Sequence, residues 1–212
     1  MWEESKHPRD DDGRFTAKNG TPAEHKRLYE KGYISEKEHL QGLHNRLTDK
    51  DWENSLSQSQ KDSIRKYTAY SSRINELLRN NRNDWDNQIK QQIEDIDNAI
   101  DKYNLKEPIT IYRRVPYKFV QREYLRDKGF SSCSISKKRV LQITQEKNKD
   151  VVYIYELSPQ KGLGAYINNL ADDTHKDDEF EFLIGRSITF IEVDSFKKDG
   201  ILYIKWRLED EW

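Results

Sequence analysis

The chain has 212 residues, of which 34% are hydrophobic and 35% are charged, and its formal net charge is −1. This balance excludes the strongly basic surface that general nucleic-acid binding needs, and no apolar run reaches the ~18 residues of a membrane span. A single cysteine excludes an internal disulfide and a cysteine-rich metal site. So polar a composition predicts a core of moderate size with much of the chain in solvated helix faces.

Residues 1–22 are polar and rich in turn-forming residues, which predicts a flexible N-terminal arm. The first residues lack the apolar core of a signal peptide. We therefore expect a protein of the bacterial cytoplasm, or one that is delivered into a target cell without a Sec-type signal. Within the arm, residues 7–15 (His-Pro-Arg-Asp-Asp-Asp-Gly-Arg-Phe) resemble a short segment of phage head and portal-associated proteins, although a generic polar tail explains them equally well.

Helical patterns follow the arm. Ser35 and Ser57 each precede a Glu or Gln by three residues, which forms a capping box ahead of apolar residues spaced three and four apart. A shorter apolar cluster lies at 74–78. The clearest pattern places isoleucines at 89, 93, 96 and 100 and a tyrosine at 103, in steps of four, three, four and three. These patterns predict a helical half over residues 23–105.

After Pro108 the apolar period changes to two, which predicts a β half over residues 106–212. The expected strands are 109–115, 151–155, 180–184, 187–193 and 201–206. Helices first and strands second indicate the α+β class rather than an alternating parallel fold. We expect one domain over residues 23–212, in which the helices cover one of two packed, mostly antiparallel sheets.

The acidic motif Glu179-Phe180-Glu181 begins one of the predicted strands. Side chains alternate along a strand, so Glu179 and Glu181 would share one face while the phenylalanines point into the core. Two carboxylates so close repel each other, an arrangement that costs stability unless function uses it. Taken alone, however, two surface acids on a solvated edge strand explain the motif.

Two further motifs are polar residues within predicted strands. Arg113 and Arg114 must point to opposite faces, so that one is solvated and the other needs an anionic partner. Ser132-Cys133-Ser134 follows a Gly-Phe pair at the start of a small polar strand. Taken singly, a structural salt bridge and an ordinary turn explain them, and Cys133 is interpreted as a small buried residue rather than a nucleophile.

In chain order these motifs resemble the aromatic-Arg, Ser-Thr-Ser and Glu-x-Glu signature of the ADP-ribosyltransferase toxin family. Upstream, residues 52–57, 64–68 and 74–79 resemble the helical half of its Rho-modifying exoenzymes and actin-modifying binary toxins. The resemblance covers roughly residues 50–208. Two departures stand out: Cys133 replaces the usual Thr, and residues 168–178 lack the aromatic residue common in the family's target-recognition loop.

The resemblance implies an α+β fold with an NAD cleft, NAD as substrate and no metal. It assigns Glu181 as the carboxylate that stabilises the cationic transition state, and Ser132 as the group that orients it. It implies that Glu179 positions the accepting side chain and helps to deprotonate it. The NAD-binding residues that it implies are Arg113 and Arg79 on the pyrophosphate, together with Asn75, Tyr67 and Ser134.

A Glu at the position of Glu179 is typical of family members that modify arginine, so the resemblance implies transfer of ADP-ribose to an arginine of a protein. We expect a monomer whose partners are NAD and an acceptor protein, without nucleic acid or membrane. Two alternatives stay open at this point. One is an NAD glycohydrolase, which passes ADP-ribose to water, and the other is a non-catalytic binding module with the same fold.

Overall fold

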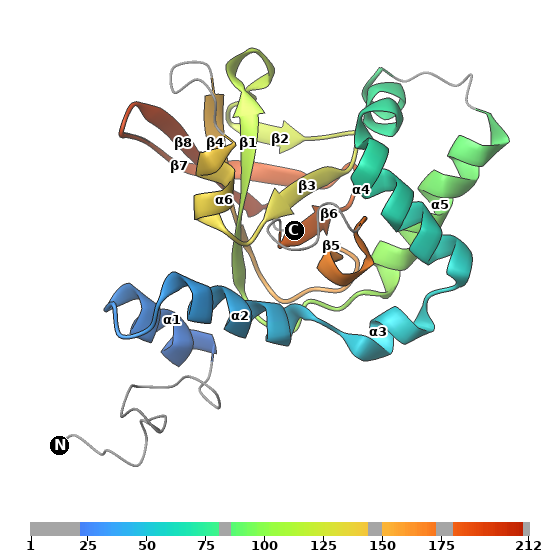
Figure 1. Ribbon diagram of the computed structural model, residues 1–212. Helices are drawn as coiled ribbons and strands as arrows, with labels where there is room; N and C mark the ends of the chain where they lie inside the picture. The colour runs from blue at the N-terminus through green and yellow to red at the C-terminus, as the bar shows by residue number, and fades with distance from the viewer. Residues whose placement is uncertain (1–21, 81–85, 144–149, 173–179, 210–212) are drawn as a thin grey trace. The chain divides into compact units, whose positions relative to one another are not determined.

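The computed structural model describes residues 22–80, 86–143, 150–172 and 180–209 (Figure 1). The predicted arm lies almost wholly outside these ranges, and so does the phage-like segment. The chain divides into two compact units, residues 1–48 and 49–212. That residues 23–212 form one domain therefore stays a prediction. No helix within the described ranges combines the length and the apolarity that crossing a membrane requires.

The first unit contains helices α1 (Pro22–Glu30) and α2 (Glu36–Leu47). The predicted capping box is present: the backbone N of Glu38 donates to Ser35 Oγ, and the Glu38 carboxylate accepts from the backbone N of Ser35 at 2.7 Å. These bonds satisfy amide groups that the start of a helix leaves without partners. Among the described residues of this unit, the buried apolar ones are Leu28, Ile34 and Leu47.

The second unit begins with helices α3 (Lys50–Ser55), α4 (Gln58–Arg79) and α5 (Asn87–Lys102). The capping box at Ser57 opens α4 as predicted. Tyr70 lies in α4 with non-helical angles (φ −139°, ψ 43°), so a kink separates the two apolar clusters that the sequence placed in different helices. The isoleucines of α5 are buried, which confirms the helical pattern.

In the described part of the chain that follows, there are eight strands and one α-helix, α6 (Lys137–Gln142). The strands are β1 (Ile109–Pro116), β2 (Tyr124–Arg126), β3 (Ser131–Ser134), β4 (Asp150–Leu157), β5 (Gly164–Tyr166), β6 (Glu181–Ile184), β7 (Thr189–Lys198) and β8 (Ile201–Leu208). They lie in the order β2-β7-β8-β4-β1-β3-β6-β5. Among the pairs of these described strands, only β4–β8 is parallel. The α+β class and the mostly antiparallel pairing are therefore confirmed.

One hydrogen-bonded sheet replaces the two separate sheets that the sequence predicted. The sheet nevertheless has a weak seam between β1 and β3, which share a single pair of partners, Tyr112 and Ser134. By contrast, β1 pairs with β4 along its whole length. Five strands thus lie on one side of the seam and three on the other, so the seam gives the sheet two halves without separating them.

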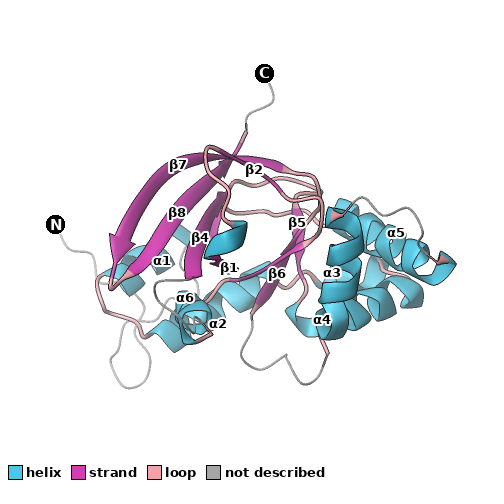
Figure 2. Cartoon of the chain, turned by 90° about the horizontal axis from the view of Figure 1, so that it is seen from above, coloured by secondary structure: helices cyan, strands magenta, loops and turns pink. Residues whose placement is uncertain are grey.

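The helices of the second unit lie against different parts of this sheet (Figures 1 and 2). α4 and α5 pack against each other beside the β3–β6–β5 end, and α6 lies beside β1 and β3. Val140 of α6 belongs to a buried cluster whose other members lie in β4 and β8: Val152, Ile154, Ile201 and Tyr203. Short 3₁₀ helices occur at Tyr117–Phe119 and Asn168–Leu170.

Candidate active site

Arg113 and Arg114 are neighbours in β1 that point to opposite faces, as predicted. Arg113 donates from Nη1 to Asp127 Oδ2 at 3.3 Å and also to Ser131 Oγ. On the other face, Nε of Arg114 lies 2.8 Å from Oδ2 of Asp150, which is almost wholly buried. The sequence predicted one solvated arginine, but both have an acidic partner, because a buried carboxylate such as Asp150 needs a counter-charge.

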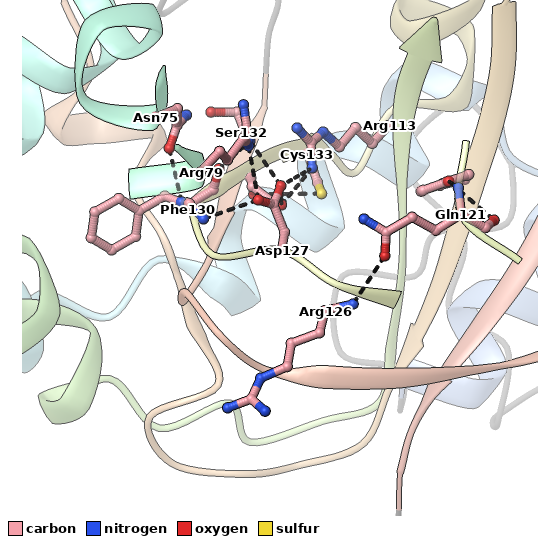
Figure 3. Close-up of polar contacts among 12 residues, drawn as sticks. Asn75, Arg79, Arg113, Gln121, Arg126, Asp127, Phe130, Ser132 and Cys133 are labelled. Carbon is pink, nitrogen blue, oxygen red and sulfur yellow. Dashed lines mark hydrogen bonds and ion pairs between the residues drawn. The ribbon is translucent and has the colours of Figure 1, made fainter. Parts of the chain in front are cut away.

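Asp127 connects the two arginines that the resemblance assigns to the pyrophosphate (Figure 3). Arg79 donates from Nε to Oδ1 and from Nη2 to Oδ2 of Asp127, both at 2.8 Å, and Arg113 reaches the same Oδ2. Burial acts to raise the pKa of Asp127, but the hydrogen bond from Arg79 and the charge of Arg113 outweigh it and hold the pKa below its usual value. Asp127 is therefore ionised beside both cations.

Tyr67 and Asn75 fasten α4 to the start of β3. Asn75 Oδ1 accepts from the backbone N of Phe130 at 2.9 Å, and Asn75 Nδ2 donates to Tyr67 Oη at 2.9 Å. Tyr67 Oη also lies 3.5 Å from Oγ of Ser132, which donates to it. Burial raises the pKa of Tyr67 to about 12, so the phenol stays protonated. These hydrogen bonds join side chains of α4 to residues 130–132 and hold that segment in place.

Glu181 begins β6 and is only 5% exposed. In the β3–β6 ladder it lies opposite Ser134, while Ser132 lies opposite Leu183. Glu181, Ser132 and Ser134 therefore share one face, and Ser132 is the diagonal neighbour of Glu181, a relation that separates Cβ atoms by about 7–8 Å. Because β6 lies between β3 and β5, the interpretation of Glu181 as a surface acid on an edge strand is wrong.

The predicted alternation through residues 179–182 is interrupted at Phe180. Its φ is 47°, in the left-handed region, and the strand begins one residue later. This conformation costs roughly 1–2 kcal/mol for an ordinary residue, so the surrounding contacts must impose it. Glu179 lies outside the described residues. Its expected place on the face of Glu181 stays a prediction, and strand alternation through Phe180 does not support it.

Cys133 lies between the two serines and is buried. Burial raises the pKa of its thiol to about 12; the charge of Arg113 acts against this rise and that of Glu181 adds to it. Both charges also act on the pKa of Tyr67, again with opposite signs. Arg113 and Glu181 thus both act on Tyr67 and Cys133, from β1 and β6 on either side of β3.

The structure unites the predicted residues Tyr67, Asn75, Arg79, Arg113 and Ser132 with two that sequence analysis missed, Asp127 and Ser131. The signal for Asp127 was a local one. An Asp two residues before a glycine is typical of a turn in which the carboxylate accepts from the backbone, and here Gly129 N donates to Oδ1 at 2.9 Å. No group of three or more potential metal ligands occurs in the part of the chain that the structure describes.

Comparison with known proteins identifies the family of this chain. The sequence profile of the ADP-ribosyltransferase exoenzyme family matches residues 43–205. Among solved structures, Plx2a, an ADP-ribosyltransferase toxin from Paenibacillus larvae, is 18% identical with a TM-score of 0.68, over 84% of this chain and 98% of that one. No curated protein matches the sequence.

Two other solved structures are similar. The Clostridium limosum C3 exoenzyme is 16% identical with a TM-score of 0.64, over 90% of this chain and 95% of that one. C3stau2 from S. aureus, a structure with NAD, is 19% identical with a TM-score of 0.61, over 76% of this chain and 94% of that one. At such identities the structures show a shared fold, and the profile shows the family. The chain therefore belongs to the ADP-ribosyltransferase exoenzyme family and is an NAD-dependent transferase.

Proposed function

We propose that this enzyme cleaves the nicotinamide–ribose bond of NAD and transfers a single ADP-ribose to an arginine of an acceptor protein. One observation carries the proposal: a buried carboxylate, Glu181, shares a face with Ser132 and Ser134 near a seam where two arginines meet at Asp127. A fixed negative charge can stabilise the cation that forms at the ribose, and guanidinium groups can bind the diphosphate of the nucleotide.

Glu181 would act on the ribose. When the glycosidic bond breaks, its electron pair leaves with nicotinamide and the ribose becomes an oxocarbenium ion. A carboxylate held in place before the reaction stabilises this charge at little reorganisation cost. Ser132 on the same face would orient the carboxylate, and its hydrogen bond to Tyr67 fixes this serine in turn. Ser134, also on this face, would contact NAD.

Arg79 and Arg113 would bind the diphosphate. Guanidinium groups suit this task because they present several N–H donors in a plane that matches phosphate oxygens, and because they remain charged at any physiological pH. Tyr67 and Asn75 would act as positioning residues. Their hydrogen bonds hold Phe130 and Ser132, and hence the start of β3, in a fixed place against α4.

The acceptor is inferred from Glu179. In the transfer step a guanidinium nitrogen of the acceptor forms the new bond to the anomeric carbon and must lose a proton, which Glu179 would receive. An arginine side chain is otherwise always protonated, so it needs such a base to react. We also infer that the enzyme works as a monomer with NAD and one protein partner, in the bacterial cytoplasm or after delivery into a target cell.

The test is transfer of label from NAD into bacterial and eukaryotic lysates, followed by mass spectrometry of the modified residue. We expect ADP-ribose on arginine. Glu179→Gln should lose this label while nicotinamide release in the absence of acceptor continues. Release of nicotinamide without protein labelling in any lysate would favour NAD hydrolysis, and label on another residue type would contradict the arginine assignment.

A further inference from the structure

Asp127 is an acid at a place where the proposed function needs an anion-binding site. Its side chain is 19% exposed, and its carboxylate lies between the guanidinium groups that would bind the diphosphate (Figure 3). A negative charge there repels the substrate's phosphates unless it contributes something that outweighs the repulsion. The contacts of Asp127 indicate what that contribution is.

Five donors converge on this carboxylate. Oδ1 accepts from Arg79 Nε and from the backbone N of Gly129, at 2.8 and 2.9 Å. Oδ2 accepts from Arg79 Nη2 at 2.8 Å, from Ser131 Oγ at 3.2 Å and from Arg113 Nη1 at 3.3 Å. A carboxylate offers about four lone-pair positions, so these donors saturate it. The bond to Gly129 also fixes Asp127 to the backbone just before β3.

Asp127 binds one of the two hydrogen-bonding edges of the Arg79 guanidinium, and this determines whether a phosphate can bind at the other edge. Nε and Nη2 form the side edge of the guanidinium, and a carboxylate bound there leaves the end edge directed elsewhere. Nη2 also donates to the backbone O of Phe130 at 3.4 Å, so the end edge would bind a phosphate chiefly through Nη1. The Arg79 side chain is 40% exposed. An arginine held by its side edge can therefore still receive a phosphate at its end edge, so Asp127 and a diphosphate need not compete for the same donors.

We propose that Asp127 is a positioning residue that holds Arg79 and Arg113 together as one preorganised receptor for the diphosphate of NAD. This inference rests on the proposed function. Without Asp127 the two cations would lose their shared counter-charge, and two flexible side chains would have to be ordered at the moment of binding, which weakens affinity. The opposite possibility is that Asp127 is an internal competitor that NAD must displace.

The experiment compares Asp127→Asn with a matched control, Asp97→Asn. Asp97 forms a similar bidentate pair with Arg186, in which Nη2–Oδ2 is 2.7 Å, so the same substitution there removes an acid–arginine pair that includes neither Arg79 nor Arg113. NAD affinity is measured by titration in a Glu181→Gln background, so that turnover does not consume the ligand. We expect Asp127→Asn to weaken NAD binding by about 10- to 100-fold, as loss of an orienting partner commonly does, and Asp97→Asn to leave it unchanged.

Inhibition separates positioning from a general loss of stability. With Glu181 restored, Asp127→Asn should raise KM far more than it lowers kcat. The inhibition constant of ADP-ribose, which contains the diphosphate, should rise with KM, whereas that of nicotinamide should stay at the parent's value. Asp127→Glu keeps the charge but moves it, so its NAD affinity should lie between those of the parent and Asp127→Asn; this variant also carries the test if Asp127→Asn does not fold.

Three outcomes would decide against the inference. Tighter NAD binding by Asp127→Asn would show that Asp127 competes with the diphosphate. Unchanged NAD affinity would show that the arginines need no orienting partner. Equal loss of affinity for ADP-ribose and nicotinamide would indicate a general disturbance of the site. If the Glu181→Gln parent and the unmodified enzyme both fail to bind NAD, the proposed function itself is wrong.

Discussion

Glu181 combines burial with a charge, so removing the charge separates a catalytic role from a structural one. Glu181→Gln keeps the shape of the side chain. Because the carboxylate acts on a cation that exists only in the transition state, we expect NAD cleavage to slow by about 10²–10³, with little change in KM. The thermal midpoint should stay the same or rise slightly, because an amide is less costly to bury than an anion. Nicotinamide release and thermal unfolding measure the two effects.

Glu156→Gln is the matched control for that substitution. The Glu156 carboxylate accepts from Arg207 Nε at 2.7 Å on the surface, so the same chemical change is made there without touching the site. Such surface pairs contribute about 0–1 kcal/mol, and the control should cleave NAD at the parent's rate. A Glu181→Gln variant that folds normally and matches the control in rate would remove Glu181 from the mechanism.

Cys133 raises a second question at the residue scale, because it replaces the Thr that is usual in the family. Its thiol is 4% exposed, and its pKa of about 12 keeps it protonated at neutral pH. Thiolates, not thiols, are the reactive form. We therefore expect Cys133→Thr to cleave NAD much as the parent does, and we expect iodoacetamide to leave the folded parent active. Stoichiometric alkylation of folded protein with loss of activity would contradict this.

At the scale of elements, strand length determined what could be predicted. β1, β4, β7 and β8 each contain at least eight residues, enough for a run of β-branched and aromatic residues to show in the sequence. β2 and β5 have three residues each, too few to establish a period, and they exist because a neighbouring strand pairs with them. The seam was also hidden, because register between distant strands leaves no local pattern.

The residues of the site also differ in whether they could be predicted from the sequence. Arg113, Ser132 and Glu181 lie in short motifs, which are recognisable because their order along the chain resembles the signature of the family. Asp127 could not be assigned from the sequence, since 48 residues separate it from Arg79 and only the fold brings the two together. Local motifs thus identified the groups proposed to touch NAD and Ser132 beside them, whereas Asp127, which joins the two arginines, became visible only in three dimensions.

Gly129 shows how closely two elements approach at the site. A Cβ atom on this residue would lie 2.5 Å from Oδ1 of Asn75 and 3.2 Å from Nε of Arg79, so β3 could not begin at its present distance from α4. We expect Gly129→Ala to lower stability by about 1–3 kcal/mol, as overpacking commonly does, and to weaken NAD binding. Denaturant unfolding and NAD titration measure both effects.

The control for Gly129→Ala is Gly185→Ala. The added Cβ would there meet a flexible side-chain end, Ile188 Cδ1, at 3.3 Å, and the next nearest atoms belong to Leu163 and Ile100 rather than to the site. The Ile188 side chain can move by a few tenths of an ångström, so NAD affinity should match the parent's. A Gly129→Ala variant with the parent's affinity and stability would show that the contact between α4 and β3 is looser than the structure indicates.

At the scale of the whole molecule, the site lies entirely in the second compact unit, from Tyr67 on α4 to Glu181 on β6. The first unit has a titratable feature of its own. His39 Nδ1 lies 3.2 Å from His25 Nδ1, and the His39 ring stacks on Tyr29 with centroids 4.3 Å apart. Burial lowers the pKa of His39 to about 4, and the charges of His25, Arg46 and Lys26 add to this shift.

This shift predicts that acid destabilises the first unit. His39 in the unfolded chain takes up a proton near the ordinary histidine pKa of 6.5, whereas the folded unit takes it up only near 4. Between these pH values the unfolded state binds more protons than the folded state. The contribution of neutral His39 to the stability of the first unit is therefore fully present above about pH 6.5 and is lost as pH falls toward 4. Hydrogen exchange at pH 7 and pH 5 should show faster opening of residues 22–47 at the lower pH.

His39→Asn tests whether His39 is responsible, because the amide can occupy the place of Nδ1 and does not titrate. In this variant the acid-dependent increase in exchange over residues 22–47 should be much smaller than in the parent. NAD affinity should follow the same pH profile in both proteins, since no residue assigned to NAD lies in the first unit. An unchanged exchange profile in His39→Asn would assign the acid response to another group, and a pH-dependent difference in NAD affinity would show that the two units communicate.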